Sequence, residues 1–170
     1  MMDKVIEFPR VTRPITAWAF FNRIIKTIRT HERHFDMGYF IVARTPEPTC
    51  GTTCCIAGWG DVLLCEPGTR FDRLSIYSSQ YGMKKALGVA LMQKANQFRW
   101  SANRAFRAEE QSTGLWFGSP AGIPGDAEYI GETIMNIRRF MRENKKALKA
   151  KIVRPGMTNK TYKIPATTGV

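Results

Sequence analysis

The sequence predicts a mainly α-helical protein, with about four helices around one core, at most a small strand pair and a basic C-terminal tail. Apolar residues recur at three- and four-residue spacing in several stretches of the 170 residues, as they do on one face of a helix. A hydrophobic content of 44% in a chain of this length is enough for one ordinary core. We therefore expect a helical domain over residues 1–150 and a basic tail over residues 151–170.

The first helix is expected over residues 16–30. Thr16 is a suitable N-cap, because its hydroxyl can accept a backbone N–H of the first turn. The apolar face that follows consists of Ala17, Phe20, Phe21, Ile24, Ile25 and Ile28. Residues 35–44 then form either a short strand or an extended, buried connector, and Pro46 and Pro48 end this segment.

A second, buried helix is expected over residues 53–65, with Thr52 or Thr53 as its N-cap. Gly58 and Gly60 give this helix a side without side chains, although glycine lowers helix stability by up to ~1 kcal/mol relative to alanine. Close approach of another backbone, with Trp59 beside it, explains why glycine stands there.

A third, long helix is expected over residues 83–106. Its apolar face consists of Met83, Leu87, Ala90, Leu91, Ala95, Phe98, Ala102, Ala105 and Phe106. The turn-rich residues 114–125 contain Trp116 and Phe117, which we expect to cover the core.

The last helix is expected over residues 126–150, with Asp126 as its N-cap and Arg154-Pro155-Gly156 as its end. Its apolar stripe consists of Ile130, Ile134, Ile137, Phe140 or Met141, and Leu148. Lysine and arginine crowd the C-terminal half of this helix, where positive charge complements the helix dipole.

The net charge of +12 is concentrated at the C-terminal end, because residues 138–163 contain ten Lys and Arg against one acid, Glu143. Such a cluster is typical of a surface that neutralises phosphates and releases counterions. A solvated helix face with a solubilising tail explains the same residues. No base-reading motif accompanies them, so we expect sequence-independent contacts. The candidate nucleic-acid-binding residues are Arg138, Arg139, Arg142, Lys145, Lys146, Lys149, Lys151 and Arg154.

The most specific motif is CGTTCCIAGW, at residues 50–59. With Phe35-Asp36-Met37 upstream, it resembles the uncharacterised small bacterial and phage proteins that carry C-G-T-x-x-C-I-A-G-W. The matching positions are Cys50, Gly51, Thr52, Thr53, Cys55, Ile56, Ala57, Gly58 and Trp59. Cys54 stands where a small residue such as alanine is expected. The resemblance implies a phage or bacterial source and no particular reaction.

Two chemistries compete with a structural role for these cysteines. Cys50 at the start of a buried helix can present a nucleophilic thiolate, but both histidines precede it, opposite to the order in papain-like peptidases. Cys50, Cys54 and Cys55 have the spacing of half a zinc site, and the sequence lacks a second half. We expect a structural motif, without a cofactor, a metal or catalytic residues, formed by Cys50, Gly51, Thr52, Cys55, Gly58 and Trp59.

These features favour a non-enzymatic, cytoplasmic protein that contacts nucleic acid through its basic C-terminal helix and tail. The N-terminal residues lack the apolar core of a signal peptide, and no apolar run approaches the ~20 residues of a membrane span. The alternative is a protein-binding module, such as a phage-encoded inhibitor of a host protein or a virion component. Such a module would expose an apolar patch, with Trp100, Trp116 and Phe117 as its candidate residues.

Overall fold

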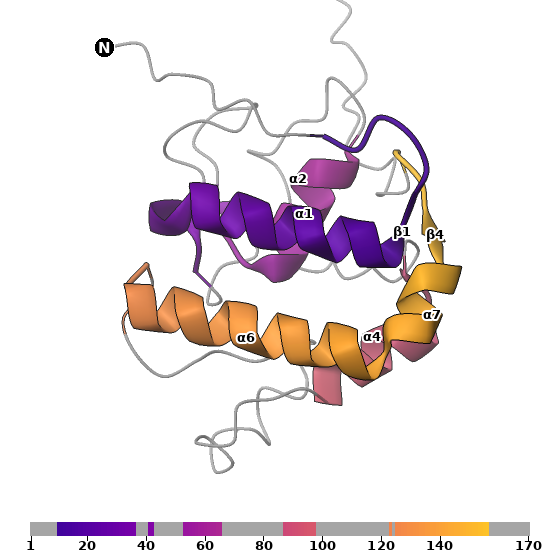
Figure 1. Cartoon of the computed structure of the whole chain (residues 1–170). Helices are drawn as coiled ribbons and strands as arrows, with labels where there is room; N and C mark the ends of the chain where they lie inside the picture. Colours follow the sequence, from indigo (N-terminus) through magenta and orange to yellow (C-terminus); the bar gives the residue numbers. More distant parts are fainter. Residues whose placement is uncertain are drawn as a thin grey trace, which may run out of the picture.

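The computed structural model describes residues 10–36, 41–42, 53–65, 87–97, 123 and 125–156. Of these residues, 70% are helical, which confirms the predicted mainly α fold (Figure 1). The helices are α1 (Ala17–Thr30), α2 (Ile56–Leu64), α4 (Val89–Gln97), α6 (Ala127–Glu143) and α7 (Lys145–Ala150), with a 3-10 turn at Glu32–His34. Two antiparallel pairs of short strands join β1 (Ile15–Thr16) to β4 (Ile152–Val153) and β2 (Ile41–Val42) to β3 (Thr53–Cys54).

Helix α1 begins where the sequence predicts. The Thr16 hydroxyl accepts the Ala19 N–H at 3.2 Å, which satisfies one of the backbone donors that a helix start leaves without a partner. All six apolar positions predicted for this helix are buried, together with Thr27, whose hydroxyl donates to the Arg23 carbonyl at 2.9 Å. The apolar face of α1 is therefore the centre of the core.

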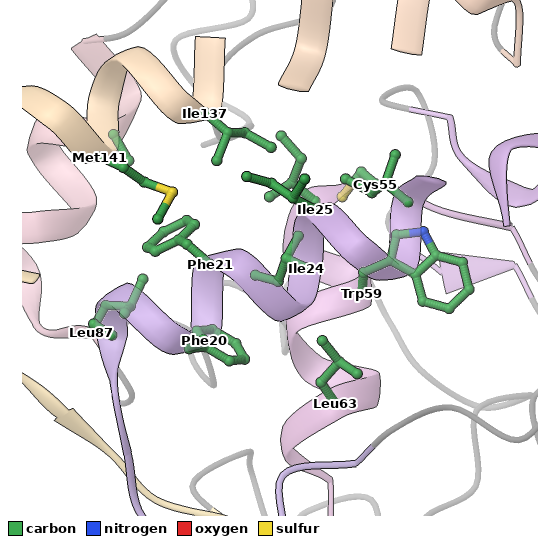
Figure 2. Packing of buried hydrophobic residues seen from close by; sticks show 14 of the residues in the cluster. Phe20, Phe21, Ile24, Ile25, Cys55, Trp59, Leu63, Leu87, Ile137 and Met141 are labelled. Carbon is green, nitrogen blue, oxygen red and sulfur yellow. The ribbon is translucent and has the colours of Figure 1, made fainter. Parts of the chain in front are cut away.

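Helices α1 and α6 lie side by side and run in opposite directions (Figure 1). One end of the pair brings Gly125 next to Glu32, and the other end brings Lys149 next to Trp18. Between them, the rings of Phe21 and Phe140 meet edge to face at 5.5 Å. Figure 2 shows the side chains of α1, α2 and α6 gathered in this core.

Every residue of helix α2 whose side chain the structure describes is buried, as predicted for residues 53–65. The predicted cap is wrong, however: Thr53 lies in β3 and Cys55 is the N-cap, while Thr52 lies outside the described residues. At the other end, the carbonyls of Leu63 and Leu64 accept backbone N–H groups from Val11 and Gly156, both at 2.8 Å. Distant parts of the chain thereby satisfy acceptors that a helix end leaves open.

The third predicted helix is interrupted at Gly88. This residue has φ +81°, which a right-handed helix does not accommodate, and α4 begins only after it. Leu87, Leu91 and Ala95 are buried as predicted, but Ala90 is exposed, so its inclusion in the apolar face was wrong. Residues 98–106 and the loop with Trp116 and Phe117 lie outside the described residues.

The helix predicted over residues 126–150 is divided at Asn144 into α6 and α7. Its predicted apolar stripe is buried, and Phe140 and Met141 both belong to it. The helix ends at Ala150, before the predicted Arg154-Pro155-Gly156, because residues 152–153 pair with β1. Among the described residues, no helix is both long and apolar enough to cross a membrane.

Candidate nucleic-acid interface

The exposed side of α6 and α7 carries most of the predicted basic residues. The side chains of the following six are exposed, and we call them the basic face: Arg138, Arg139, Arg142, Lys145, Lys146 and Lys149. Burial of Ile137, Phe140, Met141 and Leu148 turns the opposite side of the same helices towards the core. The amphipathic pattern thus separates the two sides, with cations outward and apolar groups inward.

The break at Asn144 divides the basic face between α6, which carries three of its residues, and α7, which carries the other three. Asn144 N–H donates to the Phe140 carbonyl at 3.0 Å, and Leu148 N–H donates to the Asn144 carbonyl at 2.9 Å. These bonds connect the two helices, but Asn144 leaves the helical conformation, with φ −113° and ψ 20°, and α7 turns away from the axis of α6 (Figure 1). The buried Asn144 side chain also donates to the Phe140 carbonyl, at 3.0 Å. Positions three and four residues apart are neighbours within each helix, which groups the three cations of α6 and the three cations of α7.

The two remaining candidates lie beyond the helices. Lys151 is half-buried, and its carbonyl accepts the Ala17 N–H at 2.7 Å, where the chain enters β4. Arg154 is exposed after β4. Residues 157–170, with the last two basic residues of the predicted tail, lie outside the described residues. The structure therefore places six candidates together on the basic face and two at its C-terminal end.

The basic face borders α1. Lys149 Nζ lies over the indole ring of Trp18, 5.9 Å from its centre. Farther along the exposed side of α1, the side chains of Lys26 and Arg29 are also exposed, and Arg33 follows in the 3-10 turn. The exposed acids Glu128 and Glu143 lie on α6 itself. Sequence reasoning did not find the contact between Trp18 and Lys149, because only the tertiary fold brings them together.

Three of the predicted motif residues, Cys55, Gly58 and Trp59, are buried. Cys55 is buried as the N-cap of α2, and its carbonyl accepts the Trp59 N–H at 2.9 Å. Gly58 and Trp59 are buried one turn later, and the Trp59 ring stacks on His31 at 5.9 Å. Cys50, Gly51 and Thr52 lie outside the described residues, so their roles stay predictions. The other buried thiol is that of Cys65, which donates a hydrogen bond to the Val62 carbonyl at 3.1 Å.

The two histidines are held towards the neutral form. Partial burial lowers the pKa of His31, and the nearby His34 lowers it further. Burial likewise lowers the pKa of His34, with a second contribution from the charge of Arg33. Neither imidazole therefore adds positive charge to the surface at neutral pH. In the part of the chain that the structure describes, no three His, Cys, Asp or Glu side chains gather as metal ligands would.

Asp61 is a polar residue that sequence reasoning missed. It lies in the apolar run of α2 with 3% of its surface exposed, and its Oδ1 makes no hydrogen bond within the described residues. This burial raises the pKa of Asp61 well above the ordinary value of 3.8. A lone acid inside an apolar run was the available signal.

The chain matches no family model, no curated protein and no solved structure.

Proposed function

We propose that this protein is a non-enzymatic binding protein that contacts nucleic acid through the basic face, independently of base sequence. One observation carries the proposal: six cationic side chains are exposed together on one side of α6 and α7, while the opposite side is fixed in the core. Phosphates require only positive charge at workable spacing, and a rigid helix provides it. The resemblance of residues 50–59 supports a phage or bacterial source, and we propose a cytoplasmic location.

The salt dependence of binding tests the proposal. Replacing Arg139, Arg142, Lys146 and Lys149 by glutamine removes four exposed charges from the basic face. We expect the affinity for unrelated DNA and RNA sequences to fall alike, by at least about tenfold at low salt. The slope of log affinity against log salt concentration should become shallower by about 3 units, if all four side chains contact phosphates. The melting temperature should stay within about 3 °C, because exposed charges contribute little stability.

A matched variant separates the basic face from net charge. Arg13, Lys26, Arg29 and Arg33 are also exposed and lie outside α6 and α7. Their replacement by glutamine removes the same four charges, and we expect a smaller loss of affinity and a steeper salt slope than in the first variant. Equal losses in both variants would assign the binding to net charge alone. If the parent protein failed to bind at about 50 mM salt, the proposal would be wrong.

The second candidate function is protein binding, which the exposed apolar side chains favour. Met135 lies on the exposed side of α6 with 60% of its surface accessible, next to the first residues of the basic face. Val89, Ile123 and Ile152 are exposed too, but each belongs to a different part of the fold. Scattered apolar residues are ordinary on protein surfaces, whereas a docking site needs a contiguous patch. The basic face therefore supports nucleic acid more strongly than Met135 supports a protein partner.

A further inference from the structure

Trp18 lies at the edge between the core and the basic face. It belongs to the first turn of α1 and packs against the core with part of its surface exposed. Asn22, one turn later on the same side of α1, is exposed, and its Nδ2 donates to the Trp18 carbonyl at 3.2 Å. On the other side, Lys149 Nζ lies over the indole ring. An aromatic ring is thus held by the core on one side and bordered by the cation of Lys149.

Two pairs of cations in the basic face lead towards this ring, and the last of them is Lys149. Arg138 and Arg142 are four residues apart on α6, and Lys145 and Lys149 are four residues apart on α7, so each pair lies on one side of its helix. Each pair extends along about 6 Å of its helix, since each residue adds about 1.5 Å. A phosphate backbone that contacts both pairs reaches Trp18 at Lys149.

We infer that Trp18 is a base-stacking platform, so that the nucleic acid bound by the basic face is single-stranded. This inference rests on the proposed function and adds the class of ligand. A duplex keeps its base faces stacked inside the helix, whereas a single strand exposes them to aromatic side chains. In the free protein, Lys149 Nζ occupies the position over the indole ring. Its flexible ammonium can turn to a phosphate when a base takes that place, because a stacked base contributes more than an exposed ammonium does.

Three labelled probes test the inference: an oligothymidylate of about 15 nucleotides, an abasic strand with the same number of phosphates, and a duplex of equal length. We expect the parent protein to bind the oligothymidylate more tightly than the abasic strand. Trp18→Leu should weaken binding of the oligothymidylate by about tenfold or more. The same variant should leave binding of the abasic strand and the duplex unchanged. An oligouridylate tested in parallel distinguishes RNA from DNA. Of the two strands, the one whose affinity falls more in the Trp18→Leu variant is the one that Trp18 prefers to stack on.

Two further variants separate stacking from folding. Trp18→Phe keeps an aromatic ring and should lose only about two- to threefold for the oligothymidylate. Ile15→Ala removes another partly buried apolar side chain from the same edge of the core, and its affinity should equal that of the parent. Melting temperatures of all variants report any loss of fold.

The outcomes against the inference are distinct. If the parent protein bound all three probes and Trp18→Leu bound them equally well, the stacking platform would be wrong and the proposed function would stand. A loss of equal size for the oligothymidylate and the abasic strand would also reject stacking, because the effect would not depend on bases. If the parent bound none of the probes at about 50 mM salt, the proposed function and this inference would both fail.

Discussion

Asp61 places an acid inside the most apolar helix of the protein. Because burial raises the pKa of Asp61, the folded protein keeps a proton on this side chain between pH 3.8 and the raised pKa, whereas the unfolded chain has released it. Folding in this window therefore takes up a proton. The free energy of unfolding consequently falls as the pH rises from 3.8 through the raised pKa, and the stabilising contribution is complete only below 3.8.

Replacing Asp61 by asparagine removes this titration and keeps the shape of the side chain. We expect the variant to lose less stability than the parent as the pH rises above 3.8. The difference should reach about 1–3 kcal/mol once the parent carboxyl ionises, the usual cost of a buried group without a partner. Chemical denaturation at a series of pH values measures it. Asp126→Asn makes the same exchange at an exposed position and serves as control. Identical pH profiles for the parent and Asp61→Asn would contradict the prediction.

At the level of single residues, the sequence identified what periodicity and composition encode. The exposed cations of the basic face followed from charge clustering, and the burial of Trp59 and Cys55 followed from the apolar run around them. The partnership of Trp18 with Lys149 depends on how α1 packs against α7, so no local pattern contains it. The burial of Asp61 also eluded prediction, because acids are normally exposed.

On the scale of single elements, two glycines in or beside α6 differ in whether the backbone requires glycine. Gly125 precedes α6 with φ +89°, and an added Cβ would meet the Glu32 carbonyl only at an ordinary 3.7 Å. Gly125→Ala should therefore cost about 1–2 kcal/mol through backbone strain alone. Gly131 lies within α6 on its exposed side, with nothing within 4 Å of an added Cβ. Gly131→Ala should instead stabilise the protein by about 0.5–1 kcal/mol.

Denaturant unfolding of these two single variants and the parent measures both effects. The opposite signs make the pair informative, because both exchanges add one methyl group to a glycine in or beside α6. A stabilising effect of Gly125→Ala would show that the turn before α6 does not require a positive φ.

Helical periodicity predicted α1 and α6 well because each has a complete apolar face. Their N-caps, Thr16 and Asp126, were also predicted. The errors lie at interruptions. A single positive φ at Gly88 interrupts the predicted helix, and pairing with β2 places Thr53 in a strand. The pairing with β2 is a tertiary contact, which a window of neighbouring residues does not contain.

On the scale of the whole molecule, pairing of β4 with β1 joins the C-terminal part of the described chain to its N-terminal part. Val153 is fully buried and pairs with Ile15, and Gly156 N–H donates to the Leu64 carbonyl at 2.8 Å. The charge pattern predicted a tail that begins at residue 151, whereas Val153 belongs to the core and Gly156 bonds to the end of α2. The sequence of this short strand is too polar around its two apolar residues to have indicated that role.

Two shortened chains test this closure. A chain that ends after Ala150 loses the burial of Val153 and the pairing of β4 with β1. We expect it to be less stable than a chain that ends after Gly156 by about 2–4 kcal/mol, from one buried valine and several backbone hydrogen bonds. Equal thermal unfolding of the two chains would show that β4 contributes nothing to the fold.

The order of the elements also matters while the ribosome makes the chain. Helix α1 is complete at residue 30, but α6 and α7, which cover much of its apolar face, begin about 100 residues later. At ordinary rates of translation the nascent chain must wait roughly 5–20 s for them. During that interval α1 has only α2 among its principal helical partners, so we expect the emerging chain to be a substrate for ribosome-associated chaperones.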